Sequence, residues 1–124
     1  MKTTTSQSER LFKMIPTFGQ AIRTARTSMG YSQRELAALV EIDFTYLSKL
    51  ESDSTEYPPK EYLIQQLAYY LGLDREELMC LTGRLPERYQ DFLKQNYKQM
   101  PGLFRWMRQK PDFIIKAHDS TLVP

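Results

Sequence analysis

The segment from Ser32 to Glu51, SQRELAALVEIDFTYLSKLE, constrains the fold of this chain more than any other. Ser32 followed by Glu35 is typical of a capping box at a helix start, and Asp43 is a second N-cap candidate. Apolar side chains recur at the three- and four-residue spacing of helices, at Leu36, Ala37, Val40, Ile42, Leu47 and Leu50. The segment therefore predicts two short helices joined by a tight turn.

Similar signals predict helices on both sides of this pair. Thr17 with Gln20 begins one helix that Gly30 ends, and Pro58-Pro59 precedes another that Gly72 ends. The five expected helices span residues 18–29, 32–40, 43–52, 60–71 and 74–81. The side chains expected to face inward from the first are Phe18, Ile22, Ala25 and Met29. Cys80 is expected to be a small core residue.

Beyond Gly83 the chain becomes basic and aromatic. One helix is expected from Pro86 to Tyr97 and another between Pro101 and Pro111. Their apolar residues are Tyr89, Phe92, Leu93, Tyr97, Leu103, Phe104, Trp106 and Met107. Two short helices have too little core to stand alone, so this face must cover the first five helices, a second copy of the chain or another protein. We expect a flexible N-terminal arm over residues 1–16, a domain over 17–82 and a helical extension over 83–124 with a frayed end.

Charge is distributed unevenly over these three segments. Residues 1–16 contain three Lys or Arg and one Glu, residues 17–82 contain six basic and ten acidic residues, and residues 83–124 contain eight basic and four acidic ones. A strong non-specific DNA-binding protein is more uniformly basic. The basic residues of the last segment form either a solvated face or a contact with DNA flanks or an acidic neighbour.

Composition argues against several classes of protein. The chain has 124 residues, 41% of them hydrophobic, with no apolar run long enough to span a bilayer and no signal-peptide pattern, which predicts a cytoplasmic protein. One cysteine and one histidine are too few for a typical zinc site. No nucleophile elbow or phosphate-binding glycine loop occurs, so we expect neither an enzyme nor a cofactor.

The central segment resembles the lambda-type repressor and Cro helix-turn-helix domain, often called the XRE family. The resemblance rests on the S-Q-x-x-L-A start at Ser32, the L-S-K-L-E end at Leu47 to Glu51 and the later YLIQQLAYYLGLDREEL. It implies an all-α fold of five helices around a small core, followed here by the helical extension. It also implies a sequence-specific regulator of transcription that binds double-stranded DNA as a homodimer.

The resemblance assigns roles to individual positions. It implies a phosphate contact for Gln33, a partly buried ion pair between Arg26 and Glu51, and groove-facing positions in the second helix of the pair. The candidate DNA-binding residues are Gln33, Arg34, Phe44, Thr45, Tyr46, Ser48 and Lys49. Phe44 and Tyr46 have three open roles: base contact, packing against the C-terminal helices, or a partner surface.

Two departures from the family pattern bear on affinity. Glu41 stands where the turn usually has glycine, so either the turn avoids positive φ or a non-glycine residue is strained. Asp43 places a carboxylate where phosphates would approach. Because residues 17–82 carry more acidic than basic residues, the alternative function is a protein-interaction module of the same fold, such as an antitoxin or a partner of a protease or phage factor. A mixed case combines DNA binding with protein binding: a repressor whose C-terminal helices bind an inducing protein.

Overall fold

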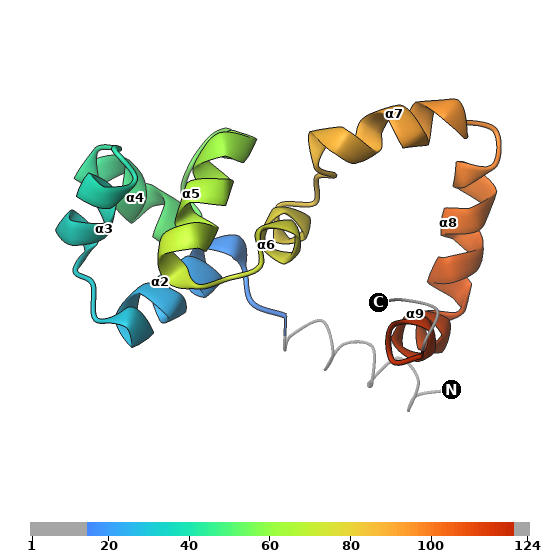
Figure 1. The fold of residues 1–124 in the computed structure, drawn as a ribbon, viewed down its shortest axis with the longest axis horizontal. Coiled ribbons are helices and arrows are strands. Elements are labelled where there is room, and N and C mark those ends of the chain that lie inside the picture. The colour runs from blue at the N-terminus through green and yellow to red at the C-terminus, as the bar shows by residue number, and fades with distance from the viewer. Residues whose placement is uncertain (1–14, 121–124) are drawn as a thin grey trace. The chain divides into compact units, whose positions relative to one another are not determined.

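The computed structural model describes residues 15–120, and these form helices with no strand among them (Figure 1). This confirms the predicted all-α class. Two compact units divide the chain, one ending at Pro86 and the other beginning at Glu87. Within the described range, no helix is long and apolar enough to cross a bilayer. Apart from its last two residues, the arm expected over residues 1–16 lies outside this range.

Helix α2 (Phe18–Met29) opens the first unit with the predicted boundaries. The Thr17 hydroxyl accepts from the Gln20 backbone N–H at 3.1 Å, and the Gln20 side chain accepts from the Thr17 N–H at 3.0 Å. The left-handed Gly30 ends the helix at φ 82°. Met29 was expected to face inward, but it is 51% exposed. The prediction was wrong because periodicity fixes a side chain's direction around the helix axis, not whether another element lies there.

Helices α3 (Gln33–Leu39) and α4 (Phe44–Glu51) are the predicted pair. Ser32 and Glu35 form the expected reciprocal capping box. Asp43 occupies the N-cap position of α4, but its side chain makes no capping hydrogen bond. The expectation that it caps the helix was therefore wrong, because residue type indicates a cap position and the local rotamer decides whether the bond forms.

Helices α5 (Glu61–Leu71) and α6 (Arg75–Leu81) complete this unit. Gly72 ends α5 in a left-handed conformation, and the Asp74 carboxylate accepts the backbone N–H groups of Glu76 and Glu77. Cys80 is exposed, which contradicts the expected core position. The core of the unit comes from all five helices: Phe18, Ile22, Leu36, Ala37, Val40, Leu47, Leu50, Ile64, Leu67, Ala68, Leu71, Leu78 and Met79.

The second unit contains α7 (Glu87–Gln95), α8 (Met100–Gln109) and α9 (Pro111–His118). None of the three helices has a buried side chain. The Trp106 and Phe113 rings meet edge to face, with centroids 4.6 Å apart, which joins α8 to α9. Helix α9 was not predicted, because Pro111 was interpreted as a boundary, whereas proline at the first helical position starts this helix. Residues 121–124, part of the end expected to fray, lie outside the described range.

Candidate nucleic-acid interface

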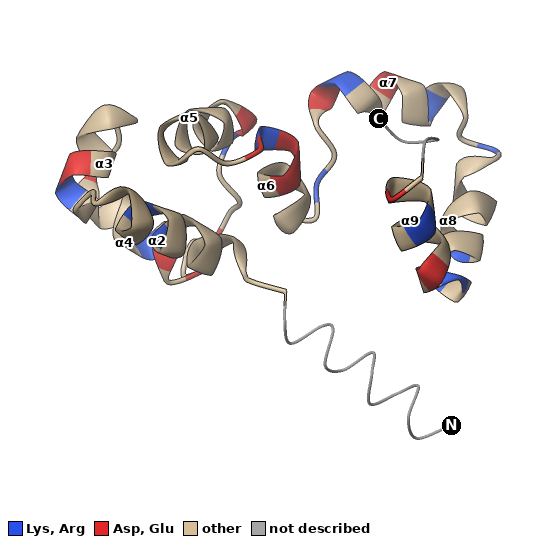
Figure 2. Ribbon diagram, turned by 60° about the horizontal axis from the view of Figure 1, so that its bottom comes forward, with Lys and Arg blue, Asp and Glu red and all other residues tan. Residues whose placement is uncertain are grey.

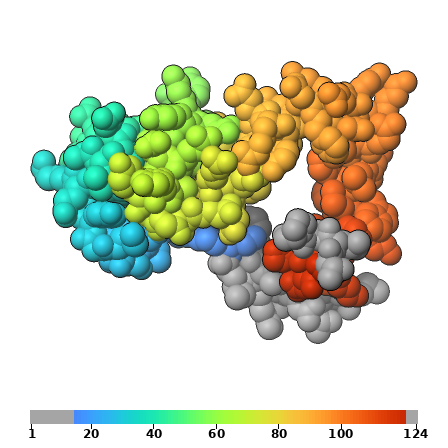
Figure 3. Space-filling view, in the orientation of Figure 1, coloured from blue at the N-terminus to red at the C-terminus, as the bar shows by residue number. Residues whose placement is uncertain are grey.

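Helix α4 has one buried side and one exposed side. Leu47 and Leu50 are 0% and 1% exposed and anchor the helix in the core. Thr45 and Lys49, four residues apart and therefore one turn apart on the same side, are exposed. In the space-filling view, α3 and α4 lie on an outer surface of the first unit (Figure 3). The helix thus offers solvent a face that carries a hydroxyl and an amine.

The seven candidate DNA-binding residues divide into two groups by exposure. The exposed group is Arg34, Phe44, Thr45 and Lys49. The half-buried group is Gln33, Tyr46 and Ser48. All seven come from α3 and α4, so the structure places them on two consecutive helices of one unit.

Arg34 and Phe44 contact each other across the turn. The Arg34 guanidinium carbon lies 4.6 Å from the centre of the Phe44 ring, within the range of a cation–π interaction. Phe44 keeps 38% of its surface exposed. Both residues were predicted at the surface, but their contact was not, because they are ten positions apart on different helices. The pair holds a positive charge beside the first turn of α4.

Tyr46 has a different environment from Phe44. It is half-buried and packs against the core of the first unit. Its ring therefore fixes α4 on the unit rather than standing free in solvent. The sequence suggested that both aromatic residues are exposed. In the structure Phe44 points outward and Tyr46 points inward, because they lie on opposite sides of the helix.

The Glu51 carboxylate lies beneath this surface and is held by three side chains. Its side chain is fully buried and accepts from Arg26 Nε at 2.6 Å and from Arg26 Nη2 at 3.0 Å. Gln33 Nε2 donates to Glu51 Oε1 at 2.9 Å, and Arg23 Nε lies 3.5 Å from the same oxygen. Arg26 Nη1 also donates to the Tyr31 carbonyl at 2.9 Å. The network ties the start of α3 and the end of α4 to α2.

Burial by itself would raise the pKa of Glu51, because a charged carboxylate loses its hydration. Hydrogen bonds from Arg26 and Gln33, the charge of Arg26 and the bond from Arg23 outweigh burial and hold this pKa below its usual value. The carboxylate therefore stays ionised beneath the candidate interface at neutral pH. Gln33 is half-buried and donates one amide hydrogen to Glu51, so the orientation of its side chain is fixed.

The turn between α3 and α4 is strained at Glu41. Its φ is 58°, which settles the alternative left by the sequence: this non-glycine residue does adopt the left-handed conformation. Glu41 and Asp43 are both exposed. Two carboxylates thus border the start of α4, while Arg34 and Lys49 supply positive charge on α3 and α4. Figure 2 shows a basic and an acidic segment next to each other on α3, and a mainly acidic α6.

A shallow depression of about 530 Å³ opens beside the C-terminal half of α4. It is lined by Tyr46, Lys49, Ser54, Thr55, Glu56, Tyr57, Pro58 and Lys60. Lys49 and Lys60 are eleven positions apart, and only the course of the loop between α4 and α5 brings them to one site. No sequence signal pointed to Lys60, because the path of an irregular loop does not follow from periodicity.

The residues predicted for a dimer or partner surface lie on α7, α8 and the segment between them. Most are exposed, namely Tyr89, Phe92, Tyr97, Leu103, Phe104 and Trp106, and Leu93 and Met107 are half-buried. Phe113, Ile114 and Ile115 of α9 are 40–57% exposed and belong to the same unit. This unit therefore presents many apolar side chains without burying any. In residues 15–120, no three His, Cys, Asp or Glu side chains are grouped so that they could hold a metal ion.

Comparison with solved structures gives a SinR protein/SinI protein complex at 18% sequence identity and a TM-score of 0.48. The match covers 77% of this chain and 99% of that chain. Comparison with curated proteins finds no match. The helix-turn-helix domain family matches residues 19–84, which is more than half of the chain. The chain therefore belongs to the helix-turn-helix domain family.

Proposed function

We propose that this protein is a sequence-specific regulator of transcription of the XRE type, most simply a repressor, that inserts α4 into the DNA major groove. The observation that carries the proposal is the two-sided character of α4. Leu47 and Leu50 fix the helix in the core, while Thr45 and Lys49 project from it one turn apart. A helix held in this way is free to enter a groove about 12 Å wide.

The candidate side chains of α3 and α4 have chemically matched partners on DNA. Lys49 can donate to guanine O6 or N7, Thr45 and Ser48 to a base or a phosphate, and Phe44 can contact a thymine methyl group. Gln33 and Arg34, at the first turn of α3, suit the phosphate backbone. Tyr46 belongs to the proposed site through its packing, which sets the height of α4 above the core.

We further propose that the protein acts as a homodimer through α7, α8 and α9. These helices bury no side chain, yet three short helices cannot form a stable core alone. A second copy would cover their apolar faces and present two α4 helices to half-sites about 34 Å apart. A cytoplasmic location and the absence of enzyme activity go with this proposal.

A protein-interaction module of the same fold is the second candidate. Its support is electrostatic: residues 17–82 contain six basic and ten acidic residues, and Glu41 and Asp43 border the start of α4. Like charges next to the phosphates weaken DNA binding, whereas an aromatic protein interface is little affected by them.

Selection of bound duplexes from a random DNA pool tests the proposal. We expect a two-fold symmetric site whose affinity falls steeply with salt, because phosphate contacts release counterions. Failure to enrich any sequence at low salt would contradict DNA reading. Binding to a protein partner with little salt dependence would then favour the second candidate.

A further inference from the structure

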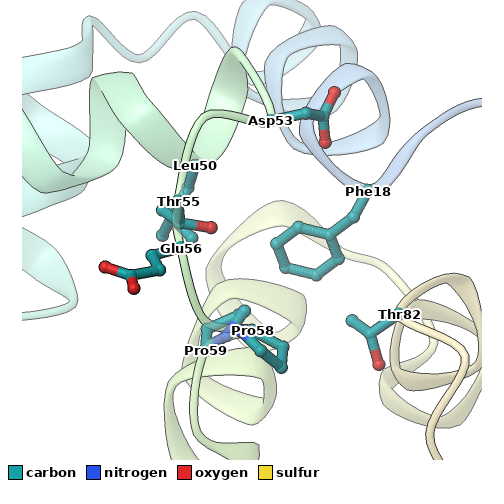
Figure 4. Close-up of a pocket in the computed structure, with 8 residues that line it drawn as sticks. All are labelled: Phe18, Leu50, Asp53, Thr55, Glu56, Pro58, Pro59 and Thr82. Atoms are coloured by element: carbon teal, nitrogen blue, oxygen red, sulfur yellow. The ribbon is translucent and has the colours of Figure 1, made fainter.

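Asp53, two residues beyond α4, joins the end of α4 to the start of α2. Its Oδ1 accepts the backbone N–H of Gly19 at 2.9 Å, and its Oδ2 accepts the Thr17 hydroxyl at 2.6 Å. Its backbone is left-handed at φ 56°, a conformation that most residues with a Cβ avoid. Figure 4 shows its carboxylate pointing toward the start of α2, at the edge of a depression of about 230 Å³ that Phe18 and Leu50 also line.

Local capping of α2 does not account for these bonds. Thr17 and Gln20 already form a complete capping box. Asp53 adds a contact across 34 residues of sequence, to an N–H that the box leaves unused. The bond therefore connects two elements and does more than complete one helix end.

The backbones of α2 and α4 approach each other closely at Gly19, because this residue has no side chain. A Cβ on Gly19 would lie 2.5 Å from the carbonyl oxygens of both Leu50 and Glu51. The last turn of α4 thus rests directly on the backbone of the first turn of α2. Asp53 adds a hydrogen bond to the Gly19 N–H at the same place.

Helix α4 is consequently attached to α2 at two separate points. Glu51 is bound to Arg26, and Asp53 is bound to Gly19. Seven residues separate Arg26 from Gly19, which is about 10 Å along a helix. Leu47 and Leu50 hold α4 in the core, and two polar attachments at that distance restrict its tilt on α2 more than one attachment would.

We infer that Asp53 is a positioning residue for DNA reading, which sets the direction of α4 by clamping its end to α2. The inference rests on the proposed function. Thr45 lies six residues from Glu51, about 9 Å along α4. A rotation of about 10° around Glu51 would move Thr45 by about 1.5 Å, more than the roughly 0.5 Å that a recognition site tolerates.

Three variants of the full chain separate the clamp from backbone strain and from general destabilisation. Asp53→Asn keeps an oxygen for Gly19, can bond the Thr17 hydroxyl and tolerates positive φ. Asp53→Gly also suits positive φ but removes both bonds. Leu78→Val trims a buried side chain of α6 and leaves the clamp untouched.

Two measurements, made in the absence of DNA, report whether the contact with α2 is intact and how α4 is oriented. We expect Asp53→Gly to lose hydrogen-exchange protection at the Gly19 amide, and its N–H residual dipolar couplings over Phe44–Glu51 to depart from the wild-type orientation. Asp53→Asn and Leu78→Val should match the wild type in both. Wild-type couplings in Asp53→Gly would overturn the inference.

Affinity is measured on the duplex that the wild type selects from a random pool, at a temperature where every variant is fully folded. We expect Asp53→Gly to bind at least tenfold more weakly, Leu78→Val to bind like the wild type, and Asp53→Asn to bind equally or more tightly. Unchanged affinity of a reoriented Asp53→Gly, or weak binding by Asp53→Asn, would overturn the positioning role. If the wild type selects no duplex, the proposed function fails, and exchange and couplings alone decide whether the clamp exists.

Discussion

The Arg26 guanidinium holds the buried Glu51 carboxylate by two hydrogen bonds, 2.6 Å from Nε to Oε2 and 3.0 Å from Nη2 to Oε1. Arg26 lies on α2, and Glu51 is the last residue of α4. Because Gln33 of α3 donates to the same carboxylate, three helices meet at one charge. The geometry of the candidate interface therefore depends on a group that no DNA would touch.

Replacement of Arg26 by methionine should destabilise the protein strongly. Glu51 would keep only the Gln33 bond and the 3.5 Å ion pair with the exposed Arg23, so a buried charge would lose its main partner. We expect a loss of about 3–5 kcal/mol in the free energy of unfolding, measured by urea denaturation. The double variant Arg26→Met/Glu51→Met should lose less, because no buried charge remains. A loss below about 1 kcal/mol for the single variant would contradict this account.

Acid should weaken the fold through Glu51. Its folded-state pKa is lowered, so its contribution is complete above the unfolded pKa of about 4.3 and is lost as pH falls through the folded pKa. Glu35 shifts in the same direction, because bonds from the Ser32 backbone and hydroxyl favour its ionised form. Urea midpoints between about pH 7 and about pH 3 measure the decline. Glu51→Gln should be less stable at neutral pH and show a flatter decline, and an unchanged slope would rule out Glu51 as its source.

Alanine at Gly19 should separate α2 from α4. The new Cβ would lie 2.5 Å from two backbone carbonyl oxygens, which cannot turn aside as a side chain can. We expect a loss of about 1–3 kcal/mol, measured by thermal unfolding. Gly102→Ala is the matched control, since its nearest neighbour is the flexible Arg105 side chain at 3.7 Å. The control should be neutral or gain about 0.5–1 kcal/mol from helix propensity, and equal effects of the two substitutions would count against the close contact.

Loss of Lys49 should alter which sequence is bound. If its amine reads a base, Lys49→Ala weakens binding by about 1–3 kcal/mol and relaxes the preference mainly at one base pair. Competition between the selected duplex and its single-base variants measures this. Arg75→Ala, at an exposed position of α6, is a control of equal charge change. Uniform weakening across all duplexes would instead identify Lys49 as a phosphate contact.

A charge on α8 should dissociate the proposed dimer. Phe104 is 42% exposed in a unit without a buried side chain. Phe104→Glu would place a carboxylate in an apolar interface, so sedimentation velocity should find monomers where the wild type forms dimers. Arg105→Glu, at the neighbouring position, should leave the dimer intact. A Phe104→Glu protein that remains dimeric would show that subunits associate elsewhere.

Local signals predicted the helices of the first unit well and the last helix poorly. The Ser32–Glu35 and Thr17–Gln20 boxes form as expected, because both partners lie within one turn of backbone. Asp43 and Pro111 were misjudged, since the same residue type can occur at a cap, a boundary or a first helical position. Met29 and Cys80 were placed inside by periodicity and by residue type, whereas burial depends on what packs against them.

The amino-acid sequence by itself determined the helical class and the helix-turn-helix pair, because these follow from bonds and spacings within a few residues. Only the tertiary structure decided which side chains meet across the chain: Asp53 with Gly19, Arg34 with Phe44, and Gln33 with the buried Glu51. Such pairs are set by loop paths and by the close approach of backbones. Loop paths and close backbone approaches produce no periodic pattern in the sequence, yet they orient the helix that is proposed to enter DNA.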